Sequence, residues 1–272
     1  MQDDDSATLA RMLDESGWRF YAITTSDRPE RQRRLREEFA RLSVDVTIHV
    51  GDRPADANGF AGIGYWGCFA SHLACLEQAR ADGATVAVIA EDDVVVATAF
   101  ARHMPQVVLQ LERRLWSMAY LGYLRASSPA RHTGLELVTR NLGRLEGWEI
   151  AGSHLYAVHA RAFDSLIDDF HARLEPGGHR IAADGVLNEY RRDGGLETLV
   201  CLPNLGYQAP SPSGITSASG VAHRIRTSIL RQQVAQRWVE SAKRLGWDIW
   251  SSLPVQLHAR AWNARVPRQR RG

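Results

Sequence analysis

The chain has 272 residues, of which 44% are hydrophobic and 24% are charged, and its formal net charge is +2. This composition is typical of a globular protein that can bury a large core. The sequence has no run of about 18 apolar residues, as a membrane-spanning helix would need, and no apolar stretch near residue 1 that is typical of a signal peptide. Its cysteines are too few for a disulfide framework, so we expect a cytoplasmic protein.

Residues 1–17 are predicted to be a polar lead-in, and residues 18–220 are predicted to form one α/β domain. In the first part of this domain, β-branched and aromatic runs alternate with amphipathic helical runs. The expected elements are a strand at 18–24, a helix at 31–42, a strand at 44–50, a long loop at 51–64, a helix at 66–81 and a strand at 85–90. This order predicts parallel strands joined by right-handed crossovers.

The pattern becomes more mixed in the second part of the domain. The expected elements are a helix at 97–111, a strand at 116–122, a hairpin or acceptor-side loop at 127–147, a strand at 155–159, helices at 161–170 and 183–192, a strand at 199–202 and a long loop at 203–219. The whole domain is therefore expected to be a mostly parallel, Rossmann-like sheet flanked by helices.

Residues 221–272 carry a net charge of +9 and contain Trp238, Trp247, Trp250 and Trp262. We expect a basic helical extension. A basic helix with tryptophans is typical of a membrane-surface element, although its aromatic side chains could equally pack on the parent domain. Nucleic acid is a third candidate partner through electrostatic attraction, but the acidic remainder of the chain argues against a broad nucleic-acid surface.

The carboxylate cluster Glu91-Asp92-Asp93 follows directly after the apolar run at 85–90. Such a run is typical of a strand buried on both faces, and ligands of open α/β sheets bind at the carboxyl ends of strands. Three consecutive carboxylates repel one another unless a hard divalent cation such as Mg²⁺ or Mn²⁺ is coordinated. The alternative is a solvated acidic loop.

Three further segments carry candidate site residues. A strand end at Thr24 leads through Arg28 to a helix start with Arg31, which is suited to binding a phosphate. Ser71 and His72 lie on the helix that follows Gly64 and Gly67, where a core or capping role is the alternative; as helix neighbours they cannot form a catalytic pair. Asp184 is an isolated acid at a helix start, where an N-cap is the alternative.

Taken in order, these segments resemble glycosyltransferase family 25, which contains lipopolysaccharide and collagen galactosyltransferases. The resemblance spans roughly residues 18–215 and rests on short matching motifs. They are Ile23 with Arg28-Pro29-Glu30-Arg31, then Gly64, Gly67, Cys68, Ser71 and His72, then Glu91-Asp92-Asp93, Tyr120-Leu121-Gly122, Gly152 to Tyr156, Asp184, and Pro203, Leu205 and Gln208. Two positions depart from the family pattern, because Thr24 replaces an Asn and Tyr65 replaces an acid.

The resemblance implies a GT-A-like fold and an inverting, metal-dependent transfer of a hexose, most simply galactose, from a UDP-sugar. The acceptor would be a hydroxyl of a glycan or glycolipid such as lipopolysaccharide core. Asp93 is the expected ligand of Mn²⁺ or Mg²⁺, and Asp184 is the expected catalytic base. Residues expected to contact the donor or to line its site are Thr24, Arg28, Arg31, Ser71, His72, Glu91 and Asp92.

Two alternatives to this function stay open. Tyr65 in place of the family acid suggests a nucleotide-sugar-binding protein with altered catalysis. A glycosyltransferase that acts on a nucleic-acid or protein acceptor is the other alternative. Cys68 is expected to be a small buried residue beneath the nucleotide site.

Overall fold

The structure is a computed structural model that describes residues 2–97, 99–126, 134–146, 149–193 and 196–208. The chain divides into two compact units, Met1–Ala222 and His223–Gly272, and every described residue belongs to the first. The predicted basic extension at 221–272, with its suggested membrane contact, therefore lies outside the described residues. None of the described helices is long and apolar enough to cross a membrane.

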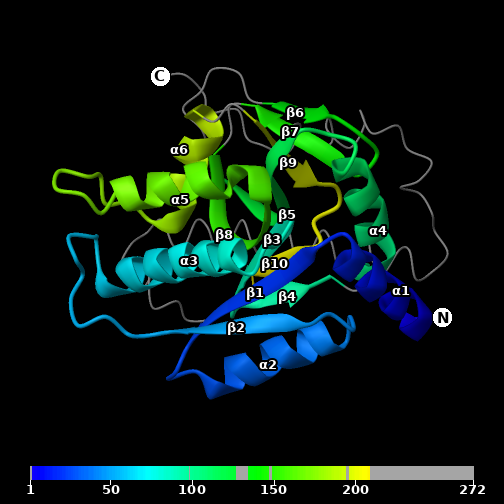
Figure 1. Cartoon of the computed structure of the whole chain (residues 1–272), viewed down its shortest axis with the longest axis horizontal. Helices are drawn as coiled ribbons and strands as arrows, with labels where there is room; N and C mark the ends of the chain where they lie inside the picture. The colour runs from blue at the N-terminus through cyan, green and yellow to red at the C-terminus, as the bar shows by residue number, and fades with distance from the viewer. Residues whose placement is uncertain (1, 98, 127–133, 147–148, 194–195, 209–272) are drawn as a thin grey trace, which may run out of the picture. The chain divides into compact units, whose positions relative to one another are not determined.

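Helices and strands follow one another along the first unit (Figure 1). The helices are α1 (Gln2–Glu15), α2 (Pro29–Ala40), α3 (Ile63–Ala81), α4 (Phe100–Leu111), the short 3₁₀ helix η1 (Ala160–Ala162), α5 (Phe163–Ala172) and α6 (Ala183–Asp193). The strands are β1 (Trp18–Thr25), β2 (Val46–Gly51), β3 (Val86–Glu91), β4 (Val94–Val96), β5 (Trp116–Ala126), β6 (Gly134–Leu137), β7 (Leu142–Glu146), β8 (Glu149–His159), β9 (Glu197–Cys201) and β10 (Gly206–Gln208).

Eight strands form one sheet in the order β2-β1-β3-β8-β5-β9-β7-β6. Strands β2, β1 and β3 are mutually parallel, and β9 is parallel to β5. Strand β8 runs antiparallel between β3 and β5, and β7 runs antiparallel between β9 and β6. All strands of the sheet except β8 and β7 therefore run in the same direction, and the predicted α/β fold class is confirmed.

Helices cover both faces of this sheet, and each face has its own hydrophobic core. One core contains buried side chains of α1, α2 and α4, and the other contains those of α3, α5 and α6. Because side chains alternate along a strand, β1 and β3 contribute to both cores. Phe20, Ala22, Val86, Val88 and Ala90 face the first core, and Tyr21, Ile23, Ala87 and Ile89 face the second.

Two features of the structure go beyond the sequence expectations, and one expectation is confirmed. The lead-in at residues 1–17 contains α1, whose Leu9 and Leu13 are buried in the first core. The hairpin predicted within 127–147 is confirmed as β6 and β7. Strands β4 and β10, of three residues each, pair antiparallel in a separate small sheet that begins directly after the carboxylate cluster.

Gly122 allows a close approach between β5 and β10. A Cβ atom at this position would lie 2.6 Å from the backbone oxygen of Gly206 and 2.9 Å from Nε2 of His154. We expect Gly122→Ala to lower the free energy of unfolding by about 2 kcal/mol, because the backbone must shift to make room. Urea denaturation measures this change.

Gly62→Ala is the control, because the nearest side-chain atom, on Tyr65, would lie 3.8 Å from the new Cβ. Its effect should stay below about 1 kcal/mol. Equal destabilisation by the two substitutions would contradict the close packing of β5 against β10.

Candidate functional site

The carboxylate cluster lies at the point in the sheet where successive strands are added on opposite sides of β1. From β1 the chain passes through α2 to β2 on one side, and β3 then pairs with β1 on the other side, with Ile23 opposite Glu91. Helices α2 and α3 cover opposite faces of these strands. Open α/β sheets form a crevice outside the carboxyl ends of the strands at such a point, and this is the candidate functional site.

Asp92 turns toward α2 and is held by cationic and hydroxyl groups. Its carboxylate lies 2.6 Å from a guanidinium nitrogen of Arg31 and 3.7 Å from one of Arg28. Thr24, at the end of β1, donates a hydrogen bond of 3.2 Å to the same carboxylate. Arg34 donates to the backbone oxygen of Asp92 at 3.4 Å. Asp92 thus anchors the start of α2 to the end of β3.

Glu91 points to the opposite face, toward α3 and β8. Its Oε1 atom accepts a hydrogen bond of 2.6 Å from Ser153 and lies 3.3 Å from Nε2 of His72. The other ring nitrogen of His72 lies 2.9 Å from the hydroxyl of Tyr156. Burial alone would raise the pKa of Glu91, but the hydrogen bonds from His72 and Ser153 outweigh it, so the pKa lies below its usual value.

Asp93 lies beside the small sheet and is incompletely bonded. Its Oδ2 atom accepts a hydrogen bond of 2.9 Å from Gln208 of β10. Its buried Oδ1 atom has no hydrogen-bond partner among the described residues. Burial and the negative charge of Glu91 raise the pKa of Asp93 to about 7. A buried carboxylate oxygen with an open bonding position and two acids beside it is suited to a divalent cation.

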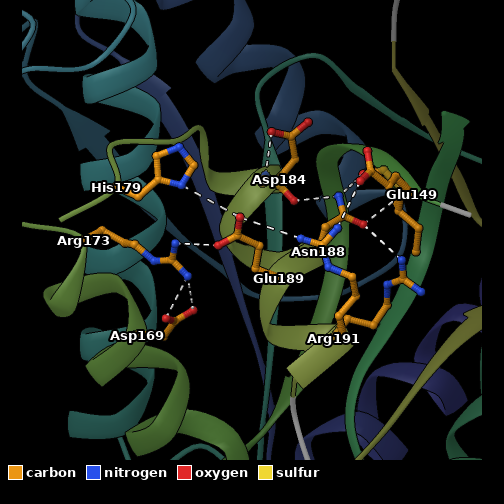
Figure 2. A network of polar contacts seen from close by, with 11 residues as sticks. Glu149, Asp169, Arg173, His179, Asp184, Asn188, Glu189 and Arg191 are labelled. Carbon is orange, nitrogen blue, oxygen red and sulfur yellow. Dashed lines mark hydrogen bonds and ion pairs between the residues drawn. The ribbon is translucent and has the colours of Figure 1, made fainter. Parts of the chain in front are cut away.

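Asp184 lies in the first turn of α6. Its two carboxylate oxygens accept hydrogen bonds from the backbone N–H groups of Gly152 at 3.2 Å and Gly185 at 3.0 Å. Figure 2 shows it at the start of a polar network that continues along α6 through Asn188. Burial raises the pKa of Asp184, and the charge of Glu91 raises it further, which places the two carboxylates in one electrostatic environment.

The N-cap role, which was the alternative for Asp184, does not describe its position, because α6 begins at Ala183 and Asp184 is its second residue. Ser71 is also placed apart from the cluster. It is buried against Gly51 at the end of β2, where a Cβ on Gly51 would lie 2.5 Å from the Ser71 hydroxyl oxygen. Among the described residues, no hydrogen bond joins Ser71 to the three carboxylates.

Four contacting residues are absent from the sequence-based set of site residues: Arg34, Ser153, Tyr156 and Gln208. Gln208 belongs to a motif that carried the family resemblance, but its contact with Asp93 depends on the pairing of β4 with β10. Cys68 lies one helical turn before His72 on α3, and it is partly exposed, whereas a buried residue was expected. Burial raises the pKa of its thiol well above the usual value, and Glu91 adds to this effect.

No family model matches the chain, and no curated protein matches it either. Solved structures with similarity include mannose-1-phosphate geranyltransferase from Thermus thermophilus, with a TM-score of 0.40 and 12% identity over 68% of this chain and 73% of that chain. Inositol-1-phosphate CTP transferase from T. maritima has a TM-score of 0.36 and 9% identity over 82% and 81% of the two chains. Both are named as transferases, and at these TM-scores neither carries an argument about the activity of this chain.

Opposite effects on stability are expected from neutralising Asp93 and Asp92. The folded state holds the Asp93 proton up to about pH 7, whereas the unfolded chain releases it near the ordinary aspartate pKa of 3.8. Asp93 therefore costs stability progressively as the pH rises from about 4 to about 7. In a chelator at pH 7.5, Asp93→Asn should raise the free energy of unfolding by on the order of 3 kcal/mol, and this gain should vanish near pH 4.

Asp92→Asn is the matched control, because it leaves the guanidinium groups of Arg28 and Arg31 without their carboxylate. We expect it to lower stability by about 2 kcal/mol at pH 7.5. Chemical denaturation across this pH range measures both effects. A stabilising Asp92→Asn together with a destabilising Asp93→Asn would contradict the bonding described for the two carboxylates.

Proposed function

We propose that this chain is a metal-dependent, inverting glycosyltransferase of the family 25 type, which transfers a hexose from a UDP-sugar to a hydroxyl of a glycan or glycolipid. Galactose is the proposed hexose, and lipopolysaccharide core is the proposed kind of acceptor. The observation that carries this proposal is the unequal bonding of the three carboxylates, which leaves a buried oxygen of Asp93 without a hydrogen-bond partner among the described residues.

Asp93 is the proposed ligand of Mn²⁺ or Mg²⁺. Its buried Oδ1 atom, which has no hydrogen-bond partner among the described residues, fits a hard cation, whereas the carboxylates of Asp92 and Glu91 are already engaged by Arg31 and by Ser153. Asp92 and Glu91 are therefore better suited to holding the residues around Asp93 in place than to coordinating the same hard cation. When bound, the cation supplies positive charge that stabilises the leaving diphosphate.

The start of α2 is the proposed contact for the diphosphate. Helix N-termini favour anions, and guanidinium groups form directional hydrogen bonds to phosphate oxygens. The side chain of Arg28 is 33% exposed, and its guanidinium is more distant from Asp92 than that of Arg31. Arg28 can therefore reach a ligand while Arg31 keeps Asp92 neutralised. On the opposite face, His72 is fully buried and holds Glu91.

Asp184 is the proposed base on the acceptor side. Its burial raises its pKa, which makes its carboxylate a stronger base than an exposed aspartate. The backbone N–H groups of Gly152 and Gly185 fix its orientation. In the transfer step, the acceptor oxygen bonds to the anomeric carbon, the bond from that carbon to the diphosphate oxygen breaks, and Asp184 receives the hydroxyl proton.

The purified protein is expected to transfer or hydrolyse UDP-galactose in the presence of Mn²⁺ or Mg²⁺ and to lose this activity in EDTA. Asp93→Asn should reduce turnover at least about 100-fold, because it removes the proposed metal ligand. A panel of UDP-sugars, scored by release of UDP and by thermal shift with and without Mn²⁺, identifies the donor. Donor binding without turnover on a broad acceptor panel would instead favour a binding protein, and full activity of Asp93→Asn in EDTA would contradict the proposal.

Asp184→Asn should lower kcat by about 10²- to 10⁴-fold, because the amide cannot accept the hydroxyl proton. Donor affinity, measured by the thermal shift with UDP-sugar and Mn²⁺, should be retained. Asp164→Asn is the control, since that exposed aspartate of α5 should leave both quantities unchanged. In the wild type, turnover should fall on the acidic side at a higher pH than the ordinary pKa of an aspartate. A loss of donor binding in Asp184→Asn with kcat unchanged would overturn the assigned role.

A further inference from the structure

Cys68, His72 and Glu91 bring a thiol, an imidazole and a carboxylate together beside the carboxylate site at Asp93. Each offers one ligand atom, and these three atoms all lie within 4.8 Å of one another. We propose that these three side chains form a binding site for a thiophilic divalent cation of the Zn²⁺ class, separate from the hard-cation site at Asp93.

The spacing of the ligands follows from the local structure. Cys68 and His72 are four residues apart on α3, so their side chains lie on the same face of the helix. Glu91 is the last residue of β3, and strand alternation directs its side chain toward the face that α3 covers. The separation of 3.3 Å between Nε2 of His72 and Oε1 of Glu91 is the contact that results.

The observed distances are close to those of a tetrahedral zinc centre. Bonds of about 2.0 to 2.3 Å from zinc to nitrogen, oxygen and sulfur give distances of about 3.3 to 3.7 Å between ligand atoms. The His72–Glu91 pair already has this separation. The Cys68 sulfur, within 4.8 Å of both partners, needs to move by at most about 1 Å, which a rotation of about 30° around χ1 of this partly exposed residue can supply.

The neighbouring hydrogen bonds also suit a metal ligand set. Metal-binding histidines usually bond a polar group through their second nitrogen, and Nδ1 of His72 lies 2.9 Å from the Tyr156 hydroxyl. That hydroxyl can act as an acceptor for Nδ1–H, so a cation can take the place of the proton that Nε2 of His72 donates toward Glu91. Ser153 holds the carboxylate of Glu91 in place with a hydrogen bond of 2.6 Å.

Ligand chemistry separates this site from the one at Asp93. A thiolate and an imidazole select Zn²⁺ or Cd²⁺, whereas carboxylate oxygens alone suit Mg²⁺ and Mn²⁺. A bound cation displaces the thiol proton of Cys68, and the resulting thiolate and the carboxylate of Glu91 together neutralise the charge of one divalent cation. Three protein ligands also leave a fourth tetrahedral position for water or a ligand, as in zinc sites that bind small molecules.

Titration of the full-length protein with Cd²⁺, followed by the thiolate-to-cadmium charge-transfer absorption, tests this site directly. The wild type should show the band at one equivalent, and Zn²⁺ should displace the Cd²⁺ in competition. Cys68→Ser should lose the band and bind Cd²⁺ at least about 100-fold more weakly. Loss of a residue that only hydrogen-bonds to a metal ligand already lowers metal affinity by about 10- to 100-fold, and loss of the ligand itself should lower it more. Glu91→Gln should keep the band but require at least about 10-fold more Cd²⁺.

Cys75→Ser is the matched control, because Cys75 lies on the same helix but is buried in the second core. It should keep the band and the affinity. Asp93→Asn should also keep both, so this result does not depend on the proposed glycosyltransferase activity. A Cys68→Ser variant that binds Cd²⁺ like the wild type, or a loss of the band in Cys75→Ser with Cys68 intact, would overturn the proposal.

Discussion

Three carboxylates in succession at the end of a buried strand cannot share one environment, and the fold separates them. Side-chain alternation along β3 directs Glu91 toward α3, and the chain then turns so that Asp92 meets Arg31 of α2 and Asp93 meets Gln208 of β10. Each carboxylate thus has its own partners, and Asp93 has fewer hydrogen-bond donors among the described residues than Glu91 or Asp92. As a result, the Oδ1 atom of Asp93 has no hydrogen-bond partner among the described residues and is available to a cation.

This separation requires segments that are distant in the chain. Thr24 is the second-last residue of β1, His72 lies in the middle of α3, Ser153 belongs to β8 and Gln208 to β10. All of them converge on the end of β3 because β1 and β8 pair with β3 on its two sides and β10 pairs with β4, which follows β3. The two helices at this point cover opposite faces, so the cluster is approached by cations from α2 and by an imidazole and a thiol from α3.

Local patterns in the sequence predicted the local parts of this arrangement. The alternation of strands and helices up to residue 90 predicted the parallel group formed by β2, β1 and β3. The apolar run before Glu91 predicted that β3 is buried on both faces. The antiparallel position of β8 between β3 and β5 depends on contacts between residues about 70 apart, which no local pattern records. The contact between Gln208 and Asp93 exists only because β10 pairs with β4. The different bonding of Asp93 and Asp92 likewise depends on contacts that form only in the folded chain.

The division of roles among the three carboxylates is the central claim, and the position of a bound cation tests it most directly. Crystals of the full-length protein soaked in Mn²⁺ would locate the ion by its anomalous scattering. The account predicts Mn²⁺ bonded to Oδ1 of Asp93, with Asp92 still paired to Arg31. Mn²⁺ bonded to Asp92, with Arg31 displaced and Oδ1 of Asp93 unchanged, would contradict it.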